Sequence, residues 1–321
     1  MIQIENIKIK NFDKKKPSKK VKSLLNKLIR EDNHIIKSLK NNYKDSWDIK
    51  KIQKYKNFSN ITLVGMGGSI MGSKSIYSFL KNRIKKNFFF LDNFENNKIQ
   101  EIKKKNNLNL IISKSGNTLE TIVNSNIIIN KKVKNIFITE NNENYLRSLA
   151  IKLKSDIIDH NNFIGGRYSV LSEVGMLPAI LMGLKVEKFR KFNELIKNKF
   201  FLNSIINSVS STISLIKKNK LNSIILNYDE KSSDLFYWYQ QLVAESLGKK
   251  GRGILPIISK MPQDNHSLMQ LYLDGTKNNF YTFFFTKEIL SQKIKNEGIL
   301  KSRDYLKHKN LQNVLYNQFL A

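Results

Sequence analysis

Hydroxyl, amide and ammonium side chains crowd one short stretch of the sequence, where an apolar run ends and a helix is expected to begin. The stretch reads Ser113-Lys114-Ser115-Gly116-Asn117-Thr118. A single Ser or Thr is enough to cap a helix, so this redundancy argues against an ordinary cap. Free N–H groups at a helix N-terminus attract anions, and the side chains add further donors. The stretch therefore predicts an anion cradle.

A glycine-rich turn precedes it in the chain. It reads Val64-Gly65-Met66-Gly67-Gly68-Ser69-Ile70-Met71-Gly72. A dinucleotide-binding fingerprint needs a third glycine where Ile70 stands. A Walker A loop is also a mismatch, because Ser73 moves Lys74 one place along and so rotates it by about 100° around the helix. The turn fits the close approach of backbone to an anion, and a strand-to-helix turn without a ligand is the alternative for this segment alone.

Further along, a pair of glycines presents an arginine in Gly165-Gly166-Arg167-Tyr168-Ser169. The permanently charged, forked guanidinium suits an anionic substrate or a developing oxyanion. An isolated Arg is more often part of a surface ion pair. Arg167 is therefore a candidate for stabilising negative charge.

Two further residues could move protons. Glu245 follows an apolar helical face, and Gly248 reads as the stop of that helix. Burial at such a place would raise the pKa of a carboxyl towards the working pH and make it a base, whereas the alternative is a solvated Glu near a helix end. His266, one of 4 histidines, stands at a predicted helix start and could transfer protons, although a lone His is usually structural.

The elements that must position these residues follow from the hydrophobic pattern. Short apolar runs at residues 61–64, 88–91, 108–112, 136–138 and 157–158 are separated by helix-length segments. A second series lies at residues 223–226, 254–258 and 280–285, with helices predicted at 201–216, 233–247 and 264–273. Strands alternating with helices predict parallel sheets covered on both faces. We expect an α/β protein with two doubly wound domains and flanking helices, including helices within residues 19–56 and 300–321.

Composition limits the class of protein. A 321-residue chain with 40% hydrophobic residues can bury a sizeable core. It has no cysteine, which excludes disulfides and thiolate metal sites and fits a reducing compartment. The first 20 residues lack an apolar signal region, and no run of about 18 apolar residues occurs. We expect a cytoplasmic protein without a membrane segment.

The net charge is strongly positive: 56 basic minus 26 acidic residues give +30. Lys residues are spread along the whole chain and Arg is scarce, whereas nucleic-acid readers concentrate Arg and aromatic residues on one element. The joint excess of Lys, Asn and Ile is typical of a drift in codon composition. The charge therefore predicts non-specific attraction of polyanions and favours a phosphorylated substrate.

Taken in order, these motifs resemble the glucose-6-phosphate isomerase family. The motifs are Gly-x-Gly-Gly-Ser, Ser-Lys-Ser-Gly-Asn-Thr, Gly-Gly-Arg-Tyr-Ser, Gln-Leu-x-x-Glu-Ser-x-Gly-Lys and His-Ser-x-x-Gln-Leu, between residues 61 and 276. The phosphate loops are similar to those of the sugar isomerase (SIS) fold. The resemblance implies an N-terminal helical extension (1–57), a first SIS domain with the phosphate loops (58–195) and a second, C-terminally incomplete SIS domain (196–321).

The resemblance also implies an activity and residue roles. Glucose 6-phosphate and fructose 6-phosphate would be interconverted through a cis-enediol, in glycolysis and gluconeogenesis, with Glu245 as the base. Arg167 would stabilise the negative charge on the intermediate, and His266 would assist ring opening from the partner subunit of a homodimer with shared active sites. No metal or other cofactor would be needed. The expected phosphate ligands are Gly68, Ser69, Ser113, Lys114, Ser115, Asn117 and Thr118.

The sequence departs from the family pattern at its end. The family continues with a late helix whose Lys acts on the sugar ring oxygen, and this sequence stops at Ala321 before such a motif. We therefore expect slow turnover of cyclic sugar and an uncovered apolar face over Leu311, Leu315 and Phe319. The alternatives are a phosphosugar-binding SIS protein that has lost turnover, and a dual phosphoglucose and phosphomannose isomerase. Glu245 favours an enzyme, because a sensor has no use for a base beside the sugar.

Overall fold

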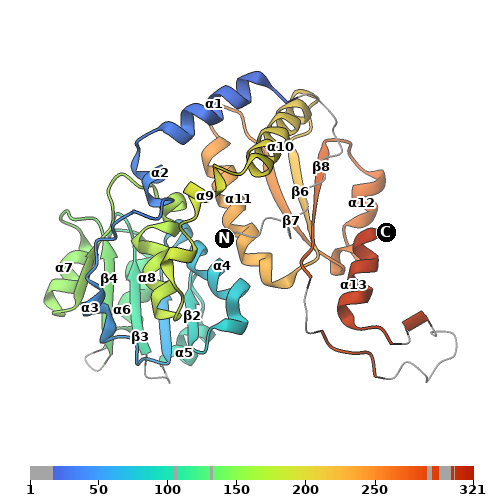
Figure 1. Ribbon diagram of the computed structural model, residues 1–321. Coiled ribbons are helices and arrows are strands. Elements are labelled where there is room, and N and C mark those ends of the chain that lie inside the picture. The colour runs from blue at the N-terminus through green and yellow to red at the C-terminus, as the bar shows by residue number, and fades with distance from the viewer. Residues whose placement is uncertain (1–16, 104–106, 131–132, 288–290, 296–304, 307) are drawn as a thin grey trace. The chain divides into compact units, whose positions relative to one another are not determined.

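Five of the apolar runs form the first sheet, as the sequence predicts. In this computed structural model, which describes residues 17–103, 107–130, 133–287, 291–295, 305–306 and 308–321, all five strands are parallel in the order β2-β1-β3-β4-β5. The strands are β1 (Asn60–Val64), β2 (Asn87–Leu91), β3 (Asn107–Ile112), β4 (Lys134–Thr139) and β5 (Asp156–Asp159). Figure 1 shows the helices that connect them.

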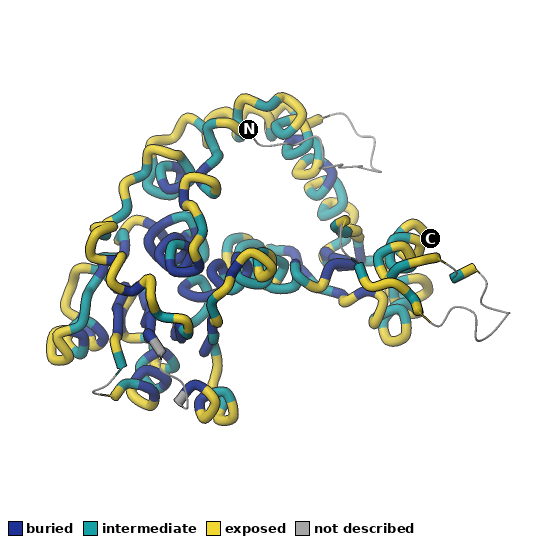
Figure 2. Tube along the Cα trace, turned by 60° about the horizontal axis from the view of Figure 1, so that its bottom comes forward, coloured by how far each residue is buried: buried dark blue, intermediate teal, exposed yellow. Residues whose placement is uncertain are grey.

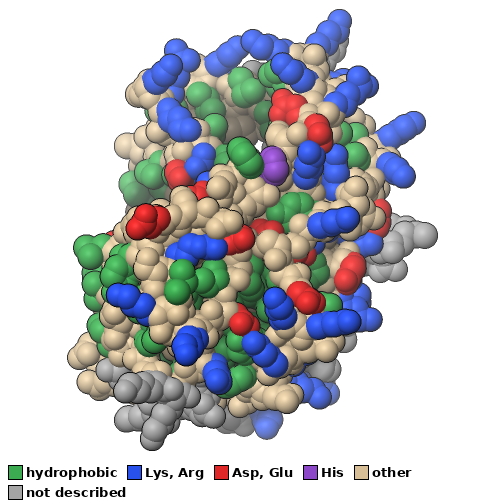
Figure 3. All heavy atoms as spheres, turned by 90° about the vertical axis from the view of Figure 1, so that its left-hand side faces the viewer, with side chains coloured by type: hydrophobic (Ala, Val, Ile, Leu, Met, Phe, Trp, Pro, Cys, Tyr) green, Lys and Arg blue, Asp and Glu red, His purple; other side chains and the backbone are tan. Residues whose placement is uncertain are grey.

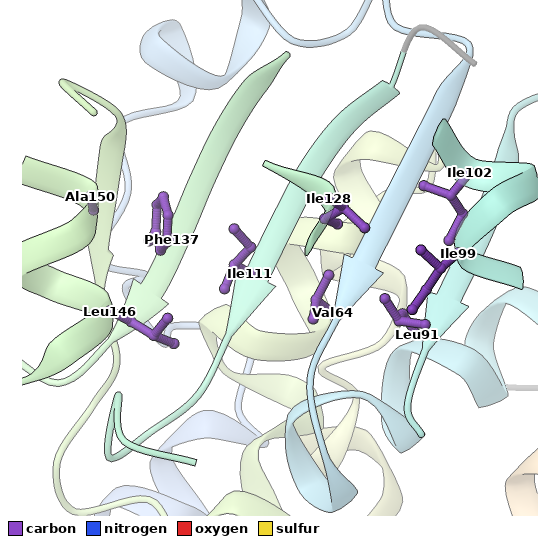
Figure 4. Packing of buried hydrophobic residues seen from close by; sticks show 9 residues of the cluster. All are labelled: Val64, Leu91, Ile99, Ile102, Ile111, Ile128, Phe137, Leu146 and Ala150. Atoms are coloured by element: carbon purple, nitrogen blue, oxygen red, sulfur yellow. The ribbon is translucent and has the colours of Figure 1, made fainter. Parts of the chain in front are cut away.

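Helices cover one face of this sheet through a continuous apolar cluster. The helices on this face are α5 (Asn96–Lys103), α6 (Leu119–Ile128) and α7 (Tyr145–Lys152), whereas α4 (Met71–Leu80), which connects β1 to β2, supplies no residue to the cluster. Val64, Ile111 and Phe137 project from the strands towards Ile128 of α6 and Leu146 of α7 (Figure 4). Alternate strand residues point to opposite faces, so this face takes every second apolar residue of the runs.

The opposite face is buried as well. Leu63, Leu110 and Ile138 have no exposed surface, and the strands are drawn as buried in Figure 2. On this side of the chain's first unit, α8 (Glu173–Leu181) packs against α4: Ser73 Oγ donates to the Val174 carbonyl oxygen at 3.3 Å. Burial on both faces explains the unbroken apolar runs and confirms the doubly wound α/β prediction.

Three helices precede the sheet within the described residues. They are α1 (Lys19–Arg30), α2 (His34–Ser38) and α3 (Ile49–Gln53). Each begins at a residue whose side chain accepts a hydrogen bond from a first-turn N–H: Ser18, Asn33 and Asp48. The helices predicted for residues 19–56 are thus confirmed, and residues 1–16 lie outside the described part of the chain.

A smaller parallel sheet lies in the second half of the chain. Its strands are β6 (Asn222–Asn227), β7 (Leu255–Lys260) and β8 (Asn279–Phe284), in the order β7-β6-β8. The long helix α10 (Lys199–Lys217) precedes it, and α11 (Ser233–Leu247) connects β6 to β7. These elements confirm the second series of runs and the helices predicted at 201–216 and 233–247.

The helix predicted at residues 264–273 is wrong in its first turn. The structure has a 3₁₀ turn, Gln263–His266, followed by α12 (Met269–Asp274). The Asp264 side chain accepts hydrogen bonds from Lys260 N, Ser259 Oγ and Ser267 Oγ, at 2.7, 2.9 and 2.9 Å. These bonds favour a local turn over a continuous helix, because Asp side chains compete with the helix for backbone groups.

The last helix, α13 (Leu311–Leu320), corrects a second expectation. Leu315 and Phe319 pack on the core of the second sheet, with the Phe319 ring 5.5 Å from that of Tyr228 and 5.2 Å from that of Phe285. An uncovered face over these two residues is therefore a wrong prediction, whereas Leu311 is exposed. Residues 300–304 and 307 of the predicted tail helix lie outside the described residues.

The chain divides into two compact units, Met1–Ser214 and Leu215–Ala321. The division falls within α10, close to its C-terminal end. The predicted boundaries at residues 57/58 and 195/196 stay a prediction. Among the described residues, none of the helices combines the length and the apolar character needed to cross a bilayer.

Candidate functional site

The strand order of the first sheet marks where a ligand would bind. The chain runs outward from β1 to β2 on one side and from β3 to β5 on the other, so the order reverses between β1 and β3. In open parallel sheets, ligands bind at the carboxyl ends of the strands at such a reversal. Gly65 follows β1 and Ser113 follows β3, and these strands pair directly. Both predicted phosphate loops therefore lie at the reversal.

The loop after β3 has an anion-binding geometry. Ser113 Oγ and Thr118 Oγ1 lie 2.9 Å apart, and Ser113 is almost fully buried. Thr118 is the N-cap residue of α6, yet its side chain makes no capping hydrogen bond to a first-turn N–H group. The loop turns at Gly116, whose φ is +66° and which lies against Asn144. First-turn N–H groups and two hydroxyls thus lie at one helix N-terminus, where the helix dipole favours negative charge.

The other three predicted ligands of this loop have side chains engaged in building it. Lys114 Nζ lies 3.3 Å from Glu140 Oε1 and donates to the Asn162 carbonyl oxygen at 2.8 Å. Asn117 Oδ1 accepts from the Tyr145 N–H at 3.0 Å. Ser115 Oγ accepts from the Asn117 N–H at 3.3 Å. The Lys114 ammonium is thus held by its own neighbours, and its predicted contact with a phosphate stays a prediction.

Arg167 lies beside the first loop. It belongs to a 3₁₀ turn, Gly166–Leu171, which we call the Arg167 turn. A Cβ atom on Gly68 would lie 2.2 Å from the carbonyl carbon of Gly166 and 2.4 Å from the Arg167 nitrogen. Gly68 therefore permits a backbone-to-backbone contact that any other residue would block. Ser69, next in the chain, is buried, and the Arg167 guanidinium lies over the Tyr168 ring at 4.6 Å.

Two buried titratable residues outside the sequence motifs, His160 and Glu173, lie near these segments. Burial lowers the pKa of the His160 imidazole, and its Nε2 has no hydrogen-bond partner among the described residues. Burial raises the pKa of the Glu173 carboxyl, which accepts from Tyr43 Oη at 3.1 Å. The signal available in the sequence was a Glu inside the apolar run that follows the Arg167 motif.

Glu245 lies in the second unit, on the last turns of α11. It is exposed there, and Gln241 Nε2 donates to its Oε2 at 3.2 Å. The helix ends at Leu247, and the Gly248 N–H donates to the Ala244 carbonyl oxygen at 2.8 Å, as expected for a stop. The second unit by itself does not bury Glu245, and no residue of α11 is fully buried.

His266 also lies in the second unit, in the turn that Asp264 organises. The imidazole is exposed, and within the described ranges its side chain makes no hydrogen bond or ion pair. Burial alone would raise the pKa of Asp264, but hydrogen bonds from Ser259, Ser267 and the Lys260 N–H hold it below its usual value. Asp264 stays ionised and fixes the turn. The Asp-x-His spacing was the signal that could have identified it.

The structure thus brings together the residues expected to hold the phosphate and Arg167, all within the first unit. Glu245 and His266 lie in the second. Over the residues that the structure describes, no group of three or more His, Asp or Glu side chains is arranged to hold a metal ion. On the face drawn in Figure 3, Lys and Arg side chains are scattered and do not gather in one patch.

Comparison with known proteins identifies the family to which this chain belongs. A sequence profile described as "Phosphoglucose isomerase" matches residues 16–255, which is most of the chain. The chain belongs to the phosphoglucose isomerase family. The matched segment contains both phosphate loops, Arg167 and Glu245, and ends before His266. The family resemblance inferred from the motifs is confirmed.

Relatives in the phosphoglucose isomerase family cover much of the chain. The glucose-6-phosphate isomerase of Methanocaldococcus jannaschii is 36% identical over an alignment of 273 positions, which covers 77% of this chain and 66% of that protein. The glucose-6-phosphate isomerase of Campylobacter jejuni is 31% identical over an alignment of 288 positions, which covers 83% of this chain and 70% of that protein. The match therefore spans about two thirds of each relative's length.

Solved structures support the fold of this phosphoglucose isomerase family member. A hypothetical protein from Thermus thermophilus superposes with a TM-score of 0.77 at 22% identity, over 94% of this chain and 78% of that one. A glucose-6-phosphate isomerase from Chlamydia trachomatis superposes with a TM-score of 0.63 at 18% identity, over 84% of this chain and 56% of that one. At these identities the likeness concerns the fold.

Proposed function

We propose that this protein interconverts glucose 6-phosphate and fructose 6-phosphate. The proposal rests on one observation: Gly68, in the glycine-rich turn after β1, contacts the Arg167 turn where the strand order of the sheet reverses. This contact brings the main chain of Arg167 against a loop suited to a phosphate, which supports a ligand anchored at its phosphate and met by the Arg167 side chain at a second, reacting position. Membership of the phosphoglucose isomerase family supports this choice among phosphosugar reactions.

The phosphate is held at the loop after β3 and at the Gly68 turn. Ser113, Thr118 and Ser69 donate hydroxyl hydrogens, and the first-turn N–H groups of α6 and the Gly68 backbone add further donors. Anchoring the phosphate fixes the open sugar chain, and this proximity lowers the entropic part of the barrier. Lys114, Ser115 and Asn117 maintain the loop and contribute through its main chain.

Glu245 is the proposed base. Its carboxylate takes the proton from C2 of open-chain glucose 6-phosphate and returns it to C1, so that a cis-enediol lies between aldose and ketose. Arg167 stabilises the negative charge that develops on the enediol oxygens. Because Glu245 is exposed in the single chain, substrate and neighbouring protein surface have to exclude water from it during the reaction.

His266 is the proposed acid–base group for ring opening, acting from the partner subunit of a homodimer. Its exposure supports this role, since its side chain is accessible at the surface of the second unit. A dual activity on mannose 6-phosphate would differ in the space around C2. A phosphosugar-binding protein without turnover is the competing class.

Turnover of fructose 6-phosphate in a coupled assay, together with solvent proton exchange at C2, tests the proposal. Glu245→Gln should abolish both turnover and exchange while binding of the sugar phosphate persists, because the base and the phosphate loops belong to different segments. Binding without turnover in the wild type would favour the non-catalytic alternative. Exchange retained in Glu245→Gln would exclude Glu245 as the base.

A further inference from the structure

The Arg167 turn is held at both ends by groups outside it. At its start, the Gly166–Arg167 peptide packs on Gly68. At its end, Arg190 Nε donates to the Leu171 carbonyl oxygen at 3.0 Å. A 3₁₀ turn this short has few and poorly aligned internal hydrogen bonds, so outside anchors determine where its side chains lie.

Arg190 is itself fixed. Only 4% of its surface is exposed. Its guanidinium forms a two-pronged ion pair with Asp45, with Nη1 2.8 Å from Oδ2 and Nη2 bonded to Oδ1. Nη1 also donates to the Tyr43 carbonyl oxygen at 3.4 Å, and the guanidinium lies over the Tyr43 ring at 4.8 Å. A forked pair combined with ring stacking is a geometry that Arg provides and Lys does not.

Residues 43–46, which we call the strap, connect Arg190 to two further elements. Tyr43 Oη and the Ser46 N–H both donate to Glu173 Oε1, at 3.1 and 3.2 Å. Glu173 is the first residue of α8 and follows Leu171 by two positions. Ser46 Oγ donates to the Asp159 carbonyl oxygen, at the end of β5, at 2.6 Å. Arg190 and the strap therefore tie the end of the Arg167 turn to the sheet and to α8.

We propose that Arg190 is a positioning residue for Arg167. Through the Leu171 carbonyl it fixes the end of the Arg167 turn, and so it sets where the Arg167 guanidinium meets the negative charge on the enediol oxygens. The inference rests on the proposed function. Arg190 is buried and touches no substrate in this role, so it acts only through the turn.

Binding of two ligands distinguishes a positioning role of Arg190 from a general effect on the stability of the protein. One is an open-chain sugar acid 6-phosphate, which has a carboxylate at C1. The other is the corresponding polyol 6-phosphate, which has an uncharged hydroxyl at C1. Both bind through the phosphate, but only the acid places a charge where Arg167 acts. In Arg190→Lys the Kd of the acid should rise about tenfold or more, the loss of a charge-assisted hydrogen bond, while that of the polyol stays within about twofold.

The chain offers a matched control and a rescue. Asp156→Asn removes a comparable anchor, the acceptor of the Tyr55 hydroxyl and partner of Lys54, at the opposite end of β5, and should leave the ratio of the two Kd values unchanged. Arg190 lines a cavity of about 700 Å³, so Arg190→Ala opens a space that guanidinium ion can enter. Millimolar guanidinium should restore the ratio in Arg190→Ala.

Asp45→Asn is the second variant if Arg190→Lys does not fold. Asp45→Asn keeps Arg190 and weakens its two-pronged pair with residue 45. The ratio of the two Kd values should therefore change in the same direction by a smaller factor. The positioning role would be overturned by a wild-type ratio of Kd values in both variants, or by an equal loss of affinity for both ligands. A wild-type protein that binds neither ligand would overturn the proposed function instead, and this outcome is distinguishable because it precedes any substitution.

Discussion

Ser113 and Thr118 present two hydroxyl oxygens, 2.9 Å apart, at the N-terminus of α6. In the proposed function each of these hydroxyls donates to a phosphate oxygen, and the other contacts come from the Ser69 hydroxyl and from main-chain groups. Side-chain donors can therefore be removed without dismantling the loop, which is turned by Gly116 and held by Asn117 and Asn144.

The double variant Ser113→Ala, Thr118→Ala should weaken phosphosugar binding by one or two charge-assisted hydrogen bonds, each worth about 1.5 to 3 kcal/mol. KM should rise and kcat should fall together, because the phosphate anchor also positions the reacting carbons. Steady-state kinetics and direct binding of fructose 6-phosphate measure both. Ser204→Ala, on the exposed side of α10, is the control for loss of a serine hydroxyl. Unchanged affinity in the double variant would place the phosphate elsewhere.

At the scale of elements, the contact between the glycine-rich turn and the Arg167 turn depends on the absence of a Cβ atom at Gly68. Gly68→Ala should destabilise the first unit by about 1 to 3 kcal/mol, because the new Cβ would lie 2.2 Å from a backbone atom that cannot rotate away. The reciprocal substitution Gly166→Ala is the control, since its Cβ would meet Gly68 Cα at 4.0 Å, an ordinary contact. Urea unfolding followed by Trp47 fluorescence in a Trp238→Phe background compares them. Equal stabilities would mean that the two turns separate easily.

The buried carboxyl at the start of α8 predicts a pH dependence. Burial raises the pKa of Glu173 in the folded protein, although hydrogen bonds from Tyr43 and the Ser46 N–H act in the opposite direction. The folded state therefore holds this proton to a higher pH than the unfolded state, and the stability it contributes is present below the unfolded pKa of about 4.3 and lost as pH rises through the raised folded value. Glu173→Gln cannot titrate.

The free energy of unfolding of the wild type minus that of Glu173→Gln should therefore be largest near pH 4 and should fall as pH rises. His160, whose pKa is lowered by burial, titrates in both proteins, so its contribution cancels in the difference. Denaturant titrations of the first unit between pH 4 and pH 7.5 measure the difference. A difference that grows with pH would mean that the Glu173 carboxylate is stabilised by its neighbours more than burial destabilises it.

At the scale of the whole chain, the second unit depends on its last helix. Phe319 packs edge-on against Tyr228 and is stacked near Phe285, and it lies in the core that covers the three-stranded sheet. Phe319→Ala should lower the free energy of unfolding of this unit by about 3 kcal/mol. Leu320→Ala removes the exposed neighbour and should change it by less than about 0.5 kcal/mol. Trp238 fluorescence in a Trp47→Phe background measures both, and similar effects would show that α13 does not stabilise the sheet.

Local chemistry made much of this molecule predictable from its sequence. Strand positions followed from apolar runs that are buried on both faces, and the loops at 64–72 and 113–118 followed from residue types that free backbone conformation or supply donors. The order of the motifs was specific enough to identify the family. The stop of α11 at Gly248 followed in the same way, because helix ends are encoded by neighbouring residues.

Only the tertiary structure determined which groups meet across the chain. Strand order put the loops after β1 and β3 side by side, and no sequence spacing encodes that order. Burial of Glu173 and Arg190 depends on the strap at residues 43–46, more than 100 positions earlier. The apolar face of its helix left open whether Glu245 is buried or solvated, because the exposure of a side chain depends on which segments pack against it. Helix and turn signals are local, whereas burial, charge pairing and the fit of Gly68 on Gly166 arise from distant segments that only folding brings together.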